Sequence, residues 1–108
     1  MRILFDQGTP LPLRDHLINH TVATVFELGW STLENGRLLA EAENSFDLFI
    51  TTDQQIRYQQ NLAGRQLAIL VLLSTSWPHI KMRIPQIQMA IDGIKSGEIG
   101  RASCRERV

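Results

Sequence analysis

The most constraining feature of the sequence is the uninterrupted apolar run LAILVLL at residues 67–73. The run is far shorter than the roughly 20 residues that a membrane-spanning helix needs. It has no polar face, so a strand formed here would be buried on both sides. Strands of that kind belong to parallel sheets that are covered by helices on both faces. The run therefore predicts an α/β fold.

Strand-like and helix-like segments alternate along the rest of the chain. Three further segments have the composition of strands, namely RILF at residues 2–5, TVATVFEL at 21–28 and DLFITT at 47–52. A capping-box pattern at Ser31 and Glu34 predicts a helix over NGRLLAEAE, and apolar residues at helical spacing predict another helix over about 85–95. Residues 74–83 have the composition of an irregular loop. We therefore expect a small three-layer α/β sandwich with a mostly parallel sheet of four or five strands.

The last ten residues, IGRASCRERV, differ in composition from the rest of the chain. Read backwards into DNA as ATC GGA AGA GCG TCG TGT AGG GAA AGA GTG, they match a widely used short-read sequencing adapter. The next adapter triplet in this frame is the stop codon TAG. We therefore interpret residues 99–108 as read-through into an adapter and expect a single domain over residues 1–98.

Charge and cysteine content narrow the function classes. Removing the three Arg and one Glu of the tail from the 11 basic and 11 acidic residues leaves 8 against 10, a formal net charge of −2. A slightly acidic domain lacks the positive field of a high-affinity nucleic-acid binder, so RNA binding would be local and salt-sensitive. Cys104 lies in the tail, which leaves the domain without a thiol nucleophile or zinc-thiolate site. Without a signal-peptide pattern or disulfide, we expect a cytoplasmic protein that does not enter membranes.

Two acids directly follow predicted strands of the same sheet. Asp6 comes after residues 2–5, and Asp53 comes after DLFITT. Ligands of open parallel sheets bind outside the carboxyl ends of the strands, so both carboxylates should lie at one edge, where the loop with Glu34 and Asn35 also opens. Carboxylates, amides and hydroxyls suit Mg²⁺ or Mn²⁺, which can activate water and neutralise a phosphodiester. Alternatively, both Asp residues only cap turns or helices, and their spacing leaves the two interpretations open.

A further group of residues combines ring surface with positive charge. Trp77, Lys81 and Arg83 could stack on RNA bases or pair with the RNA backbone. Arg57, in RYQQN, could donate hydrogen bonds to a phosphate. The alternative is a Trp that covers the edge of the core beside solvated cations. The three histidines show no metal-ligand spacing.

Several linked motifs resemble one family. The segments MRILFDQGTP, HTVATVFELGW and LFITTDQQIRYQQNLAGRQLAILVL are similar to the PIN-like family of small uncharacterised bacterial proteins, which are relatives of the PIN-domain ribonuclease toxins. The resemblance covers about residues 1–97 and depends on the linked order of the LFD, LGW and TTD motifs.

The resemblance implies a PIN-like Rossmannoid fold with an acidic metal site that cuts RNA, often beside a small antitoxin-like partner. It makes Asp6 and Asp53 the catalytic and metal-binding acids. Glu34 would assist catalysis, and Asn35 occupies a ligand position where many relatives have an acid. Gln55 also stands where relatives have an acid, and each lost charge weakens divalent binding. A single, weakly held Mg²⁺ or Mn²⁺ is therefore expected.

Three functions are compatible with these residues. The first is a metal-dependent ribonuclease that acts as the toxin of a toxin-antitoxin pair. The second is a non-catalytic PIN-like module that binds RNA or a protein partner, including a second copy of itself in a homodimer. The third is a receiver-like phosphoacceptor, with Asp53 as the phosphorylated residue. That chemistry needs an acid pair after the first strand, where Asp6 is followed by Gln7, so we place it last.

Overall fold

The computed structural model describes residues 1–54, 66–95 and 97–102. Within them, five strands form one sheet in which every pairing is parallel. The strands are β1 (Arg2–Phe5), β2 (Thr21–Thr24), β3 (Leu48–Thr51), β4 (Ala68–Leu72) and β5 (Ile99–Ala102), in the spatial order β2-β1-β3-β4-β5. The expected α/β class and parallel sheet are confirmed, and the arrangement is compatible with a Rossmann-like fold.

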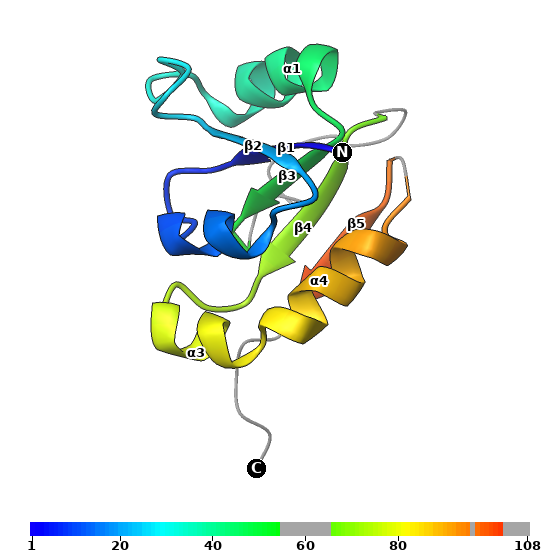
Figure 1. The fold of residues 1–108 in the computed structure, drawn as a ribbon. Coiled ribbons are helices and arrows are strands. Elements are labelled where there is room, and N and C mark those ends of the chain that lie inside the picture. Colours follow the sequence, from blue (N-terminus) through cyan, green and yellow to red (C-terminus); the bar gives the residue numbers. More distant parts are fainter. Residues whose placement is uncertain (55–65, 96, 103–108) are drawn as a thin grey trace.

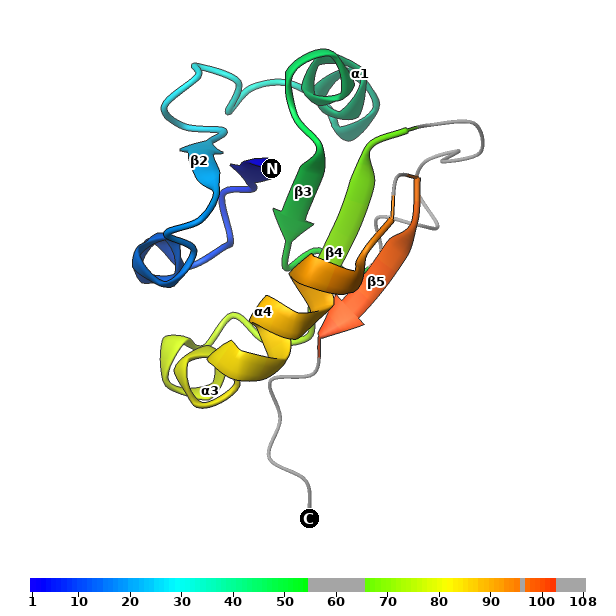
Figure 2. The same cartoon turned by 45° about the vertical axis from the view of Figure 1, so that its right-hand side comes forward.

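Helices cover both faces of this sheet (Figure 1). Helix α1 (Asn35–Ser45) lies on one face. The short 3₁₀ helix η1 (Leu11–His16) lies on the other face, together with α3 (Trp77–Met82) and α4 (Ile84–Gly93). Figure 2 shows the same arrangement from a second direction, with α1 and α4 on opposite sides of the strands. The three layers expected from the sequence are therefore present.

The central strands are buried on both faces. Every residue of β3 and β4 is buried, and successive side chains enter opposite halves of the core. From β3, Leu48 and Ile50 pack in the half covered by η1, α3 and α4, whereas Phe49 packs in the half covered by α1. The apolar run at residues 67–73 therefore has no polar face because neither side of β4 reaches solvent.

Helix α3 corrects one expectation from the sequence. Residues 74–83 were expected to form an irregular loop, but Trp77–Met82 are helical. Ser76 occupies the N-cap position, and Pro78 lies in the first turn, where its missing N–H has no intrahelical partner to lose. Only Ile80 of this helix is buried. Since one buried residue makes no periodic stripe, the apolar pattern could not reveal the helix.

The segment at residues 21–28 also differs from its predicted form. The strand ends at Thr24, and residues 25–29 form a turn that closes at Gly29, whose φ is +72°. A capping box fixes the start of this turn: the Thr24 N–H donates to Glu27 Oε1, and the Glu27 N–H donates to Thr24 Oγ1, both at 3.0 Å. The box thus lies at Thr24 and Glu27, seven residues before the predicted pair Ser31 and Glu34. Helix α1 begins instead with Glu34 as its N-cap residue and without a side-chain cap.

The fifth strand lies in the segment that we set aside as adapter-derived. Ile99–Ala102 pair in parallel with β4, from Ile69 opposite Ile99 to Leu72 opposite Ala102. Strand pairing uses backbone groups and makes few demands on side-chain identity. A short segment of varied composition can therefore occupy this position, and the adapter interpretation stays a prediction. In the described part of the chain, no helix has the length and apolarity needed to cross a bilayer.

Candidate functional site

The candidate site lies where the strand order reverses. Strand β1 is flanked by β2 and β3, and the chain reaches these neighbours through η1 on one face of the sheet and α1 on the other. Connections that leave toward opposite faces open a crevice at the carboxyl ends of the central strands, which is the usual ligand position in open parallel sheets. Asp6 directly follows β1 at this edge, and Asp53 follows β3.

A single buried hydroxyl links these two acids. The Thr51 hydroxyl donates a hydrogen bond to Asp6 Oδ2 at 2.8 Å and accepts one from the Asp53 N–H at 3.0 Å. Thr51 is fully buried, while both Asp residues are half-buried. The other carboxylate oxygen of Asp6 accepts the Gln7 N–H at 2.9 Å. The structure therefore places the backbone of Asp53 beside the Asp6 carboxylate, which is held by both of its oxygens.

The loop after β1 is fixed against the end of β3. The Asp6 N–H and the Thr9 hydroxyl both donate to the Ile50 carbonyl, at 2.9 and 3.0 Å. Between them, Gly8 lies so close to Thr52 that a Cβ atom at this position would be 2.4 Å from the Thr52 hydroxyl oxygen. The absence of a side chain at Gly8 thus lets the two loops that bear the acids approach each other.

We expect a Thr51→Val substitution to lower any activity of this site by about 10–100-fold, because groups that orient metal ligands commonly have effects of that size. Valine keeps the volume and branching of the buried side chain but removes one hydrogen bond from Asp6 and one from Asp53. The rate of RNA cleavage, which is the activity expected from the sequence, and the thermal unfolding midpoint measure the two consequences. Thr21→Val is a matched control, since Thr21 is exposed at the start of β2. An unchanged rate in Thr51→Val would contradict the orienting role.

A pocket of about 390 Å³ opens beside Asp6, between the loop after β1 and the turn after β2. Phe26 and Leu11 form its apolar part. Glu27 lines it as well, and Arg14 of η1 donates hydrogen bonds to both of its carboxylate oxygens. This ion pair, together with the capping box, attaches the turn to η1 and so fixes one wall of the pocket.

The Arg14 hydrogen bond, aided by the Thr24 N–H, holds the pKa of the Glu27 carboxyl below its usual value of 4.5. Because the pKa is lower in the folded state, the stabilisation is complete above about pH 4.5 and is lost as the pH falls through the lowered value. Glu27→Gln keeps a capping-box side chain but loses the charge. We expect urea unfolding to show a stability difference between wild type and Glu27→Gln that is constant near pH 7 and shrinks below pH 4.5. A pH-independent difference would contradict this account.

The other predicted site residues are less closely gathered. Glu34 is exposed at the N-cap position of α1, and Asn35 is the first residue of that helix. Across the described residues, no group of three or more His, Cys, Asp or Glu side chains is arranged to hold a metal ion. Glu34 therefore does not join Asp6 and Asp53 in such a group, and the site rests on two carboxylates.

Two of the predicted RNA-binding residues, Trp77 and Lys81, lie on helix α3 rather than in a loop. Trp77 is half-buried against the core, with its ring centroid 5.9 Å from that of His16. Lys81 is exposed on α3, and Arg83 lies between α3 and α4. The packing of Trp77 matches the alternative in which this ring covers the core edge, so it offers less stacking surface than we expected. Arg57 lies outside the described residues.

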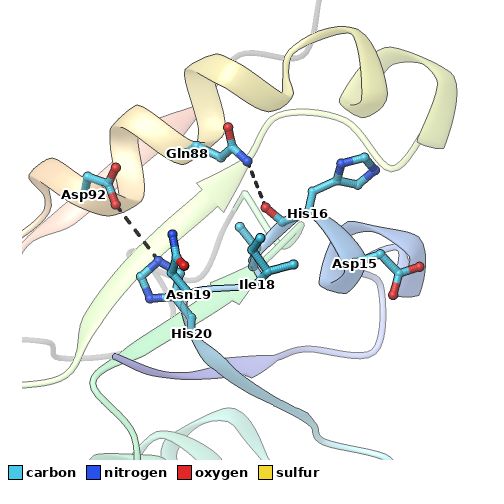
Figure 3. Close-up of a pocket in the computed structure, with 8 residues that line it drawn as sticks. Asp15, His16, Ile18, Asn19, His20, Gln88 and Asp92 are labelled. Carbon is cyan, nitrogen blue, oxygen red and sulfur yellow. Dashed lines mark hydrogen bonds and ion pairs between the residues drawn. The ribbon is translucent and has the colours of Figure 1, made fainter.

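A second pocket, of about 400 Å³, lies at the end of the sheet where β2 begins (Figure 3). Two contacts cross it. The Gln88 side chain donates to the His16 carbonyl at 2.8 Å, and His20 Nε2 lies 4.0 Å from an Asp92 carboxylate oxygen. Both contacts join the segment before β2 to helix α4. We therefore assign these residues to the packing of that helix and not to chemistry.

The sequence analysis missed three residues of the site, namely Thr51, Phe26 and Glu27. Glu27 had a recognisable signal in the capping-box spacing from Thr24, whereas no pattern distinguished Thr51 from its neighbour Thr52. Comparison with known proteins adds no assignment, since no protein-family model, curated protein or solved structure matches the chain. A function must therefore be argued from the chemistry of the site.

Proposed function

We propose that this chain is a metal-dependent ribonuclease of the PIN-like class, in which Asp6 and Asp53 hold Mg²⁺ or Mn²⁺. The supporting observation is the Thr51 hydroxyl bridge, which joins the Asp6 carboxylate to the backbone of Asp53 where the strand order reverses. The contact from the Asp53 N–H to the Thr51 hydroxyl is a local turn bond, whereas the contact from Thr51 to Asp6 joins residues 45 positions apart and holds the Asp6 carboxylate against the end of β3. The bridge thus fixes the Asp6 carboxylate beside the loop that carries Asp53, which is the placement that a cation shared by the two acids requires.

The donor set fits a single, weakly held cation. Each oxygen of the Asp6 carboxylate accepts one hydrogen bond and keeps a further lone pair. Mg²⁺ is commonly held by one or two carboxylates while it retains several waters. When bound, such an ion supplies an activated water and neutralises charge on a phosphodiester. The chain's own contribution is to orient Asp6 through Thr51 and to keep the two loops in contact.

The remaining expectations from the sequence belong to the same proposal. Glu34 and Asn35 assist from the start of α1, and the exposed Lys81 with Arg83 attracts the RNA backbone, as local cations do in a chain without a positive field. The physiological role is that of a toxin with a small antitoxin-like partner, and the chain acts alone or as a homodimer in the cytoplasm.

The test is RNA cleavage by the purified chain. We expect a labelled single-stranded RNA to be cut in Mn²⁺ and to stay intact when EDTA removes the metal. Isothermal titration should show one Mn²⁺ per chain, bound weakly because only two carboxylates are present. Cleavage that persists in EDTA, or the absence of Mn²⁺ binding, would exclude the metal-dependent reaction.

One observation favours the non-catalytic alternative. Phe26 and Leu11 remain 77% and 55% exposed beside Asp6, which gives the site an apolar surface that phosphodiester hydrolysis does not require. Exposed apolar surface commonly marks a binding site. In this alternative, the chain retains RNA or a protein partner without cutting. Retention of intact RNA on a filter in Mn²⁺ would support it.

A further inference from the structure

The pocket beside Asp6 has a composition that the metal site leaves unexplained. Its two largest apolar side chains, Phe26 and Leu11, are exposed, while Phe5 and Phe49 are fully buried. Asp6 and the exposed residue Gln7 line the same pocket. A planar ring and hydrogen-bonding groups therefore line one pocket of about 390 Å³.

The turn that holds this ring is fixed in place. Phe26 lies between the two members of the capping box, Thr24 and Glu27. The backbone N–H of each donates a hydrogen bond to the side chain of the other. Glu27 is also paired with Arg14. A ring on such a turn loses little conformational freedom when a ligand packs against it, and this lowers the cost of binding.

The charges of the pocket exclude some ligands. Asp6 and Glu27 are both acids, and the neighbouring cation, Arg14, is already paired with Glu27. A bare phosphate would therefore be repelled from this pocket. An uncharged planar group with amino donors suits it better, because carboxylate and amide oxygens accept hydrogen bonds from such groups and because any flat ring can stack on Phe26.

We propose that this pocket binds a nucleobase of single-stranded RNA, with the base stacked on Phe26 and its edge hydrogen-bonded to the Gln7 amide. The inference rests on the proposed function, since Asp6 lines the pocket and also belongs to the metal site. The phosphate of the same nucleotide would be held by the metal ion that the proposed function assigns to Asp6 and Asp53, and not by the pocket itself. Phe26 thus selects a base-bearing, unpaired strand as the substrate, because a base within a duplex could not leave its stack without an energetic cost.

The test compares two probes that differ only in the base, adenosine 5′-monophosphate and ribose 5-phosphate, each titrated in Mg²⁺ and followed by NMR. In the wild type we expect the nucleotide to bind about tenfold or more tightly, as base stacking on aromatic side chains predicts. Phe26→Ala should bind the two probes equally, and Phe26→Trp should keep the preference. Met89→Ala is the matched control, because Met89 is 73% exposed on α4, away from the pocket.

Equal affinity of the two probes in the wild type, or a preference that persists in Phe26→Ala, would overturn the proposal. Failure of the proposed function is distinguishable, since it appears as RNA that stays intact in Mn²⁺. A base preference that depends on Phe26 but occurs without cleavage would support the base pocket and count against the nuclease. In an active enzyme, Phe26→Ala should also raise KM for RNA by about tenfold and leave kcat nearly unchanged.

Discussion

The double variant Asp6→Asn/Asp53→Asn is expected to lose metal-dependent RNA cleavage by at least about a hundredfold. Asparagine has nearly the shape of aspartate, and its one carbonyl oxygen can still accept the Thr51 hydroxyl, while its amide group no longer accepts the Gln7 N–H. The substitutions therefore remove two charges with little change in packing. Because Mg²⁺ and Mn²⁺ depend on carboxylate charge, the variant should bind neither ion measurably. Cleavage of labelled RNA and calorimetric titration with Mn²⁺ give the two readings.

The matched control is Asp15→Asn/Asp47→Asn, which removes the same number of charges from exposed positions. Asp15 lies on η1, and Asp47 precedes β3, where it accepts the Arg2 N–H at 2.8 Å. Neither lies at the carboxyl edge of the sheet. This control should keep the wild-type rate, which separates loss of the site from a general change in RNA attraction. Equal cleavage by wild type and Asp6→Asn/Asp53→Asn would indicate a contaminating nuclease and end the proposal.

The central strands could be predicted because burial restricts the residue types that they contain. Strands β3 and β4 are buried on both faces, so every position is restricted to apolar or small side chains. The last helix was also readable: it was expected over about 85–95 and is found at Ile84–Gly93, with Ile84, Ile87 and Ile91 buried. Helix α3 buries only Ile80, so its sequence carries no comparable signal.

The end of β2 shows how two correct rules can be applied at the wrong position. The β-branched run from Thr21 suggested that the strand continues to residue 28, but a capping box at Thr24 turns the chain first. The same pattern at Ser31 and Glu34 seemed to start α1, which begins without a side-chain cap. A local motif of this kind needs only four residues, so sequence alone does not say which copy is used.

The sequence could predict which edge of the sheet carries the candidate site, but not the contacts between its side chains. In a parallel sheet, residues that follow neighbouring strands share one edge, so Asp6 and Asp53 could be placed together before any side chain was known. Which hydroxyl joins them could not be foreseen, because Thr51 and Thr52 differ only in the direction in which the strand presents them. The sequence also did not reveal that Phe26 is exposed. Phe26 and its neighbour Val25 are both apolar, and only Val25 is buried.

Phe49→Ala is expected to lower the free energy of unfolding by about 3–5 kcal/mol, the range observed when a buried Phe is truncated. The Phe49 ring is fully buried, and its residue lies in register between Leu4 of β1 and Ile69 of β4, under the cover of α1. Truncation leaves a cavity that two strands and a helix would have to close together. Urea unfolding followed by circular dichroism measures the loss.

Phe26→Ala makes the same chemical change at a ring that is 77% exposed, so it should alter the free energy of unfolding by less than about 0.5 kcal/mol. The pair of variants therefore tests the division of labour between the two aromatic residues. If Phe49 packs the sheet against α1 and Phe26 binds a ligand, Phe49→Ala should lower the free energy of unfolding, and Phe26→Ala should lower the preference for a base. If Phe26→Ala lowered the free energy of unfolding by several kcal/mol, the Phe26 ring would be needed for the fold. Its exposure beside Asp6 would then no longer indicate a ligand-binding role.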